Sequence, residues 1–245
     1  MVERGASRSI RNALKQRPWL RSTYYLSIAL RQMVADQWKN PSSFDSIFSD
    51  AEDPWNSTSE SEQHRFATTL GVLAKSGRAR FPTAVEIGCA EGIFTSLLIP
   101  YCNDILGLDY SEVALARART RFDEDPQVRF RQWDMRTGKI DGQFELVVAM
   151  GVLTSLYRPT DVRRACRMIV DAVRPGGFLL FSDVRQSRVF ERAWWGPLVL
   201  RGGEQIRRLL TRAYGLEIVA SADSESHVFA LLRRPSHPRR ELDGH

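Results

Sequence analysis

Residues 85–92 read Val85-Glu86-Ile87-Gly88-Cys89-Ala90-Glu91-Gly92, and this stretch decides the fold of the chain. It continues a short apolar run and then supplies small residues where a helix should begin. A second apolar run, residues 105–108, ends about 20 residues later in Asp109. A bare backbone turn followed at this distance by a carboxylate is typical of a strand–turn–helix unit that binds a nucleoside. The turn lies beside the linker of the ligand, and the carboxylate reaches the ribose hydroxyls.

The spacing and the charges of this stretch indicate which nucleoside it binds. A dinucleotide-binding turn reads G-x-G-x-x-G/A, and its amides meet a pyrophosphate. Here the small residues fall at Gly88, Ala90 and Gly92, so the third dinucleotide position is not small. Glu86 and Glu91 oppose a diphosphate, since like charges about 4 Å apart cost about 4 kcal/mol near a protein surface. The same carboxylates suit S-adenosylmethionine, which carries a sulfonium and an α-ammonium group.

Beyond residue 109 the chain alternates predicted strands, helices and turns. Strands are expected at residues 128–133, 144–149 and 178–183, helices at 159–173 and from about 203 to 214, and a terminal hairpin at 216–220 and 226–232. The near-continuous apolar run at 144–149 is typical of a strand buried on both faces. Short connections between these elements predict a parallel α/β sheet with right-handed crossovers, whose ligand binds at the carboxyl ends of the strands. Four acidic residues fall at or near those ends: Glu86, Asp109, Asp134 and Asp183.

Taken together, these motifs resemble class I S-adenosylmethionine-dependent methyltransferases over about residues 55–233. The motifs are VEIGCAEG at 85–92, GLD at 107–109, WD at 133–134, FELVVAMGVL at 144–153 and PGGFLLF at 175–181. The resemblance implies a Rossmann-like sheet, parallel with a C-terminal antiparallel hairpin, and an N-terminal helical lid. It also implies an N- or O-methyltransferase that uses S-adenosyl-L-methionine and releases S-adenosyl-L-homocysteine.

A narrower resemblance is to the NodS-type nodulation methyltransferases, which N-methylate an amino sugar of a chitooligosaccharide. It is carried by Asp53-Pro54-Trp55, Ser59, Glu62, the EIGCAEG turn and Thr95. The sequence departs from that family on the acceptor side, because Gly151 stands where the family's strand-four motif usually carries an acidic residue. Thr154 and Ser155 stand where aromatic residues often follow. The expected acceptor is therefore stated more broadly, as an amine or hydroxyl of an amino sugar, a glycoside or another secondary metabolite.

The expected cofactor site draws on most of these motifs. Around the methionine portion we expect Glu86, Gly88, Cys89, Ala90 and Gly92; around the nucleoside Asp109, Tyr110, Asp134 and Met135; and at the floor and lid Met150, Gly151, Trp55 and Arg65. For Met135 and Met150 the alternative is ordinary core filling.

No catalytic residue is assigned from the sequence. His64 in the lid and Asp183 are candidate general bases, with a surface position for His64 and loop capping for Asp183 as the alternatives. Because Gly151 offers no carboxylate, catalysis by positioning is expected.

The charge distribution divides the chain into three parts. Residues 1–66 are expected to form a helical extension or lid, since residues 1–40 hold eight Lys/Arg against two acidic residues. Residues 67–234 are the expected methyltransferase domain, and residues 235–245 a flexible tail. An insertion at about 185–203 contains Trp194-Trp195 within an Arg-rich block. The Trp pair is either a platform for the acceptor or a packed cover beneath a loop.

Composition limits the remaining possibilities. No apolar stretch reaches the ~18 residues that a membrane span requires. Three cysteines without metal-ligand spacing indicate a reducing, cytoplasmic setting and no metal site.

Three alternative functions stay open: a nicotinamide-dependent oxidoreductase, a nucleic-acid methyltransferase and a non-catalytic cofactor-binding module. A pI near 9.5, with 31 Arg against four Lys, favours the second. Strand four, however, lacks the Asn/Asp-Pro-Pro-aromatic motif of base-amine methyltransferases. The oligomeric state is open.

Overall fold

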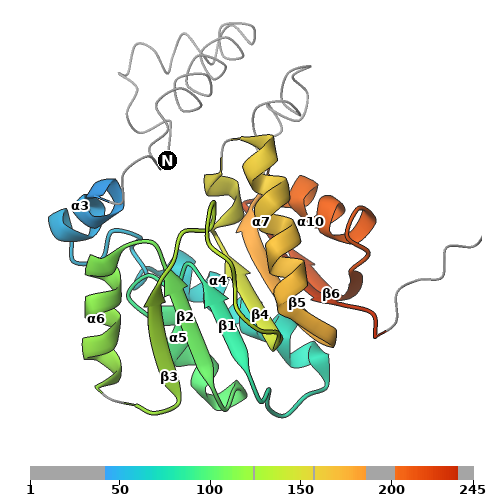
Figure 1. The fold of residues 1–245 in the computed structure, drawn as a ribbon, viewed down its shortest axis with the longest axis horizontal. Helices are drawn as coiled ribbons and strands as arrows, with labels where there is room; N and C mark the ends of the chain where they lie inside the picture. The colour runs from blue at the N-terminus through green and yellow to red at the C-terminus, as the bar shows by residue number, and fades with distance from the viewer. Residues whose placement is uncertain (1–41, 124, 157, 186–201, 237–245) are drawn as a thin grey trace, which may run out of the picture.

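The computed structural model describes residues 42–123, 125–156, 158–185 and 202–236 (Figure 1). Its helices are α3 (Ser42–Asp50), α4 (Glu60–Leu73), α5 (Ile93–Leu98), α6 (Glu112–Phe122), α7 (Pro159–Ala172) and α10 (Gly203–Arg212), with short 3₁₀ turns η3 (Ala74–Ser76), η4 (Ile99–Tyr101) and η5 (Leu153–Ser155). Its strands are β1 (Ala84–Ile87), β2 (Ile105–Asp109), β3 (Val128–Gln132), β4 (Phe144–Met150), β5 (Val173–Val184), β6 (Glu217–Asp223) and β7 (His227–Arg233).

The strands form one seven-stranded sheet in the order β3-β2-β1-β4-β5-β7-β6. β1 pairs in parallel with β2 on one side and with β4 on the other, so the direction of winding reverses beside β1. Ligands of open α/β sheets bind at the carboxyl ends of the strands at such a reversal. β7 lies between β5 and β6 and runs antiparallel to both. The predicted parallel sheet with a C-terminal antiparallel hairpin is therefore confirmed.

Both faces of the sheet are buried, as the apolar run of β4 predicts. Leu146 and Val148 point to one face and pack with apolar residues of α4 and α5. Val147 and Ala149 point to the other face and pack with α7 and α10. In Figure 1, α7 lies in front of the sheet and α5 behind it. Side chains of a strand alternate between faces, so a strand with helices on both sides needs apolar residues at every position.

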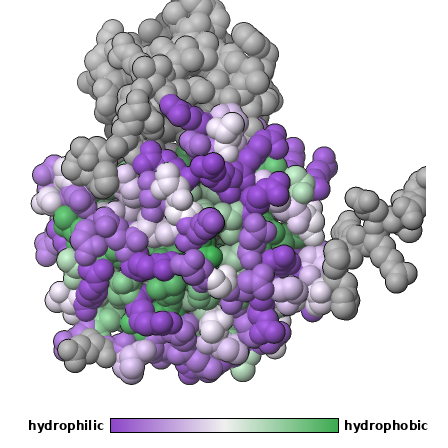
Figure 2. Space-filling view, viewed as in Figure 1, coloured by the Kyte–Doolittle hydropathy of each residue, from purple (hydrophilic) through white to green (hydrophobic). Residues whose placement is uncertain are grey.

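The connection from β3 to β4 carries no helix. Residues 133–143 are all described, and they form only turns and loop. The face of the sheet that carries α7 therefore has no crossover helix over β1–β3. Figure 2 shows a green, apolar area in this lower part of the molecule, surrounded by purple, polar side chains. Leu106 of β2 and Phe144 of β4 are only partly buried against the core on this face.

The sequence predicts a turn at residues 175–177, but β5 runs without interruption from Val173 to Val184. The pairing with β4 shifts register between Phe144 and Leu146, which accommodates the extra residues. Gly176 adopts φ +78°, and its amide donates to the carbonyl of Arg234. Hydrogen bonding to Arg234, the residue after β7, thus outweighs the local turn preference of Pro-Gly-Gly.

Several sequence expectations lie outside the described residues. These are the basic extension at residues 1–41, most of the insertion (186–201) with Trp194-Trp195, and the tail from residue 237. Among the helices that are described, none combines the length and the apolar character that crossing a membrane requires.

Candidate functional site

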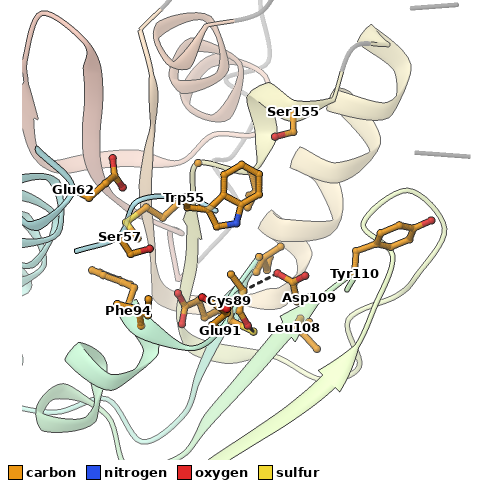
Figure 3. A pocket seen from close by; sticks show the side chains of 18 of the residues that line it. Trp55, Ser57, Glu62, Cys89, Glu91, Phe94, Leu108, Asp109, Tyr110 and Ser155 are labelled. Atoms are coloured by element: carbon orange, nitrogen blue, oxygen red, sulfur yellow. Dashed lines mark hydrogen bonds between the residues drawn. The ribbon is translucent and has the colours of Figure 1, made fainter. Parts of the chain in front are cut away.

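A cavity of about 380 Å³ opens at the carboxyl ends of β1, β2 and β4. Its walls come from three sources: the turn after β1, the ends of β2 and β4, and the helical lid formed by α3, the loop at residues 51–59 and α4. In Figure 3 the Trp55 indole projects into the space between Glu62 on one side and Asp109 and Tyr110 on the other. Trp55 is 42% exposed, so its ring lies at the mouth of the cavity.

The turn after β1 needs small residues because of its backbone and its neighbours. Gly88 and Gly92 have φ of +73° and +74°, and Ala90 has φ +48°. A β-carbon on Gly88 would lie 2.2 Å from Cγ1 of Val152. Glycine adopts positive φ without the steric cost that other residues bear. The turn therefore holds its backbone against the cavity, with no side chain between.

Asp109, the last residue of β2, ties this turn to the next helix. Its Oδ2 accepts from the amide of Ala90 at 2.8 Å, and its Oδ1 accepts from the amide of Ser111 at 2.9 Å. Ser111 in turn caps α6, accepting from the Ala114 amide at 3.2 Å. A carboxylate has about four acceptor sites, so Asp109 keeps capacity for the hydroxyls of a ribose. Burial raises the pKa of Asp109, opposed by these backbone hydrogen bonds.

Glu86 is a nearly inaccessible carboxyl, only 2% exposed, beneath the turn. The hydroxyl of Thr95 donates to its Oε2 at 2.5 Å. Burial raises the pKa of Glu86 to about 8; the Thr95 hydrogen bond opposes this shift, and the nearby charge of Asp109 adds to it. A cation bound beside Glu86 would favour its charged form and lower its pKa again.

The second carboxylate of the turn has a different role. Glu91 pairs with Arg117 of α6 at 2.5 Å, so its charge is compensated inside the protein. Arg117 also donates to the carbonyls of Phe48, Ala51 and Glu52 at the end of α3. The sequence argument treats Glu86 and Glu91 alike. In the structure Glu91 is paired with an arginine that contacts α3, whereas the described contacts of Glu86 include no ion pair.

The opposite end of α3 is fixed to α6 as well. Oδ1 of Asp45 accepts from the hydroxyl of Ser111 at 2.6 Å and from the amide of Val113 at 3.4 Å. Phe44 and Phe48, one helical turn apart on α3, both line the cavity. Phe48 is buried and contacts Trp55 edge to face at 6.0 Å. Polar contacts at both ends of α3 therefore hold its apolar face over the cavity.

The end of the cavity nearest β7 carries polar side chains. Glu62 and Arg65 of α4 form an ion pair, with Oε2 of Glu62 accepting from Nε of Arg65 at 2.9 Å. The guanidinium lies 3.8 Å from where a β-carbon on Gly151 would be. His227, the first residue of β7, also lines this end. The arrangement leaves space above Gly151 between a charged pair and an imidazole.

The structure brings most of the predicted site residues to the cavity wall. Those that line it are Trp55, Arg65, Glu86, Gly88, Cys89, Ala90, Asp109, Tyr110, Met135, Met150 and Gly151. Gly92 shapes the turn without lining the cavity. Asp134 does not line it either, and its carboxylate pairs with Arg136 at 2.9 Å.

Neither candidate base from the sequence lines the cavity. His64 is exposed on α4, and its main-chain carbonyl only accepts from the hydroxyl of Thr68. Asp183 is buried and accepts from the amide and the hydroxyl of Thr154 and from the amide of Val184. These contacts fit the alternatives of a surface position for His64 and loop capping for Asp183.

Sequence reasoning did not include several lining residues in the expected cofactor site, namely Phe44, Phe48, Glu62, Phe94, Trp133, Ser155, Val184 and His227. The i, i+4 spacing of Phe44 and Phe48 is a signal that could have found the apolar face of α3. His227 reaches the cavity only because β7 pairs antiparallel with β5, a long-range contact. Across the described ranges, no group of three or more His, Cys, Asp or Glu side chains could hold a metal ion.

Comparison with known proteins points to one family. A family model described as nodulation protein S (NodS) matches residues 47–221. Nodulation protein S of Bradyrhizobium diazoefficiens is 32% identical over 56% of this chain, and the match spans 65% of that relative, slightly under two thirds of its length. A ubiquinone biosynthesis O-methyltransferase of Methylococcus capsulatus is 30% identical over 62% of this chain and 57% of its own length.

A solved structure gives the same result. The crystal structure of the N-methyltransferase NodS from Bradyrhizobium japonicum, in complex with S-adenosyl-L-homocysteine, is similar with a TM-score of 0.66 and 28% identity. The similarity covers 76% of this chain and 93% of that one.

Proposed function

The chain belongs to the nodulation protein S family, and on that premise we propose that it is an S-adenosylmethionine-dependent methyltransferase acting on an amine or a hydroxyl of a small molecule. The observation that carries the proposal is the pairing of a bare positive-φ turn with two carboxyls at neighbouring strand ends, the buried Glu86 and the half-buried Asp109. The neutral thioether product found in the NodS crystal structure is the expected product here as well.

Electrostatics support this cofactor over a dinucleotide. Glu86 carries no compensating cation among its described contacts, only the Thr95 hydroxyl. Glu86 is protonated at neutral pH without ligand. A pyrophosphate would keep it in that neutral form and gain no charge pairing, whereas a sulfonium or α-ammonium group would favour its ionised form and gain an ion pair. Asp109 has free acceptor capacity for the ribose, and Tyr110, Trp133 and Met135 supply apolar walls for an adenine.

The proposed reaction requires little covalent chemistry from the protein. The acceptor attacks the methyl carbon in line with the departing sulfur, so holding the two reactants in that geometry supplies much of the rate. The lid over the cavity excludes water while the cofactor is held. The acceptor would enter beside Trp55, at the mouth, and approach the methyl group above Gly151.

Both acceptor atoms are represented among the relatives. The NodS protein of known structure is named an N-methyltransferase, and the Methylococcus relative is named an O-methyltransferase. A small-molecule acceptor fits a cavity of about 380 Å³ that the lid partly covers. We propose an amine or hydroxyl on a sugar-like molecule as the acceptor class.

Calorimetry with three ligands tests the proposal. S-Adenosylhomocysteine and S-adenosylmethionine should bind with micromolar or tighter Kd, while NADH should not bind. Incubation with S-adenosylmethionine and a panel of amino sugars, glycosides and phenols, followed by mass spectrometry, should then show a 14 Da gain on one acceptor. Tight binding of NADH with no binding of S-adenosylhomocysteine would refute the assignment. Binding of S-adenosylhomocysteine without methylation of any acceptor would favour the non-catalytic module.

A further inference from the structure

The proposed function assigns no role to one titratable side chain at the end of the cavity nearest β7, where we expect the acceptor to bind. His227 begins β7, where it pairs with Val184 of β5, and both residues line the cavity. Glu62 and Arg65 reach the same end from α4, which packs across β7. Within the described residues the one other histidine, His64, is exposed on α4 and lies outside the cavity.

Local contacts orient the imidazole of His227. Its Nδ1 lies 2.9 Å from the hydroxyl of Ser226, and its backbone amide donates to the hydroxyl of Ser224 at 2.9 Å. The ring packs against Phe229 with 6.1 Å between ring centroids. When Nδ1 carries the proton and donates to Ser226, Nε2 is left with a free lone pair. A general base needs that tautomer.

The surroundings of His227, above all its burial, favour the neutral imidazole. Burial lowers the pKa of His227, and the guanidinium of Arg65 lowers it further, while Glu62 opposes the shift. On the neighbouring strands, Asp183 is fully engaged with Thr154 and Val184, and Asp223 pairs with Arg185 at 3.2 Å. An imidazole that is neutral at pH 7 can accept a proton immediately.

We propose that His227 is the general base that takes the proton of the methyl acceptor. The inference rests on the proposed function, and it names the residue that the reaction needs on the acceptor side. As the acceptor oxygen or nitrogen bonds to the methyl carbon, the S–CH₃ bond breaks and its electron pair stays on sulfur. The proton of the acceptor passes to Nε2 of His227, and the resulting imidazolium releases it to solvent. Atoms and charge balance, since a cationic cofactor becomes a neutral thioether and one proton is released.

The space above Gly151 fits this role. A side chain at position 151 would stand between Arg65 and the strand ends, since its β-carbon would lie 3.8 Å from the guanidinium. With glycine there, the acceptor can reach the imidazole, and no carboxylate at position 151 competes for its proton. The Glu62–Arg65 pair then contacts the remaining polar groups of the acceptor.

The state of the imidazole can be measured without an acceptor. In ¹⁵N-labelled protein saturated with S-adenosylhomocysteine, NMR should show His227 neutral at pH 7, with Nε2 unprotonated and a midpoint below 6.5. Replacing Arg65 by Gln should raise the midpoint. A protonated His227 at pH 7, or a proton fixed on Nε2, overturns the proposal.

Kinetics supply the second test. The variants are His227→Gln and, as the matched control, His64→Gln; the acceptor probes are fully deacetylated chitotriose and caffeic acid. We expect His227→Gln to lose about 100-fold or more in kcat and to lose the acidic limb of the pH profile. Its Kd for S-adenosylhomocysteine should stay within twofold of wild type, and His64→Gln should match wild type throughout.

The outcomes separate the two proposals. A His227→Gln variant that keeps kcat within threefold overturns the role of His227 and leaves the proposed function standing. Wild-type protein that fails to bind S-adenosylhomocysteine overturns the proposed function, and with it the base. If neither probe is methylated, the tautomer and the titration midpoint measured by NMR decide whether His227 is the base.

Discussion

Gly88 is restricted to glycine for two reasons that can be measured separately. Its φ is +73°, and a β-carbon there would lie 2.2 Å from Cγ1 of Val152. Gly77 has a similar φ of +70° but open space around the position of its β-carbon. The two glycines therefore form a matched pair, in which only Gly88 combines backbone strain with a collision.

Replacing Gly77 by Ala should destabilise the fold by about 1 kcal/mol, the cost of a left-handed non-glycine residue. Replacing Gly88 by Ala should cost about 1 to 3 kcal/mol more, because the methyl group forces Val152 to move. Urea unfolding monitored by tryptophan fluorescence gives both values. The double variant Gly88→Ala, Val152→Ala should recover part of the loss. Equal effects at the two glycines would show that the collision is relieved at no cost.

Asp109 joins the turn to the proposed ribose site, so removing its carboxylate should affect ligand binding most. We expect Asp109→Ala to weaken S-adenosylhomocysteine about 100-fold, or about 3 kcal/mol, through loss of charge-assisted hydrogen bonds. Isothermal titration calorimetry measures the change. The control is Asp104→Ala, which removes a surface pair with Arg129 away from the cavity. An unchanged Kd in Asp109→Ala would show that the ribose lies elsewhere.

At the scale of elements, one arginine holds the lid helix in place. Arg117 of α6 donates to three carbonyls at the end of α3 and pairs with Glu91, which is 5% exposed. Removing the arginine leaves a buried carboxylate and the end of a helix without their partner. Arg119, on the same helix, pairs with Glu112 at the surface.

We therefore expect Arg117→Met to loosen α3 and to cost about 1 to 3 kcal/mol, a range reduced because the arginine is partly exposed. Arg119→Met should change stability by about 0.5 kcal/mol or less. Limited proteolysis should cut residues 42–57 faster in Arg117→Met, and saturating S-adenosylhomocysteine should restore protection. Identical cleavage in the two variants would show that Arg117 does not hold the lid in place.

Elements whose sequence signal is local were predicted well. The turn at residues 88–92, the helix at 159–172 and the strand at 144–150 follow from spacing and apolar runs, and the structure places them within a residue or two of the expected bounds. The uninterrupted β5 was not predicted, because the hydrogen bonds of Gly176 and Gly177 to Arg234 join residues far apart in the sequence.

The candidate site shows the same difference between residues with a local sequence signal and residues placed by long-range contacts. Residues of the turn and of the strand ends were found from local motifs, and they line the cavity. Asp134 was selected by its place after a strand, yet Arg136, two residues later, takes its carboxylate. His227 was missed, because only the antiparallel return of β7 brings it beside α4. Pairings that depend on chain topology leave no pattern in a single sequence.

At the scale of the whole molecule, the buried carboxyl of Glu86 links stability, cofactor and pH. The pKa of Glu86 is about 8 in the folded protein and 4.5 as the reference value. The folded state therefore binds one more proton than the unfolded state between these pH values. Stability must fall as pH rises through this window, by up to about 5 kcal/mol. This loss of stability is complete above pH 8 and absent below pH 4.5.

The variant Glu86→Gln isolates this contribution, because glutamine keeps an acceptor for Thr95 and does not titrate. The melting temperature of wild-type protein without ligand should fall relative to that of Glu86→Gln between pH 5 and 8. His227, with its lowered pKa, acts in the opposite direction, but it is present in both proteins and cancels in the difference. Parallel melting curves over this range would show that Glu86 is already ionised.

Cofactor binding should lower the raised pKa of Glu86. S-Adenosylmethionine places positive charge beside Glu86, so binding below pH 8 should expel its proton, and the affinity should rise by up to about tenfold per pH unit as pH approaches 8. Calorimetry at pH 7 in phosphate and in Tris, whose ionisation enthalpies differ, measures the number of protons released. We expect close to one proton for wild type and far fewer for Glu86→Gln. The same heat in both buffers would mean that no proton leaves. If the melting curves show Glu86 protonated without ligand, the cation would then have to bind away from β1. Because the sheet, the turn and the lid all converge on this carboxyl, one proton count tests whether they were built around a positively charged ligand.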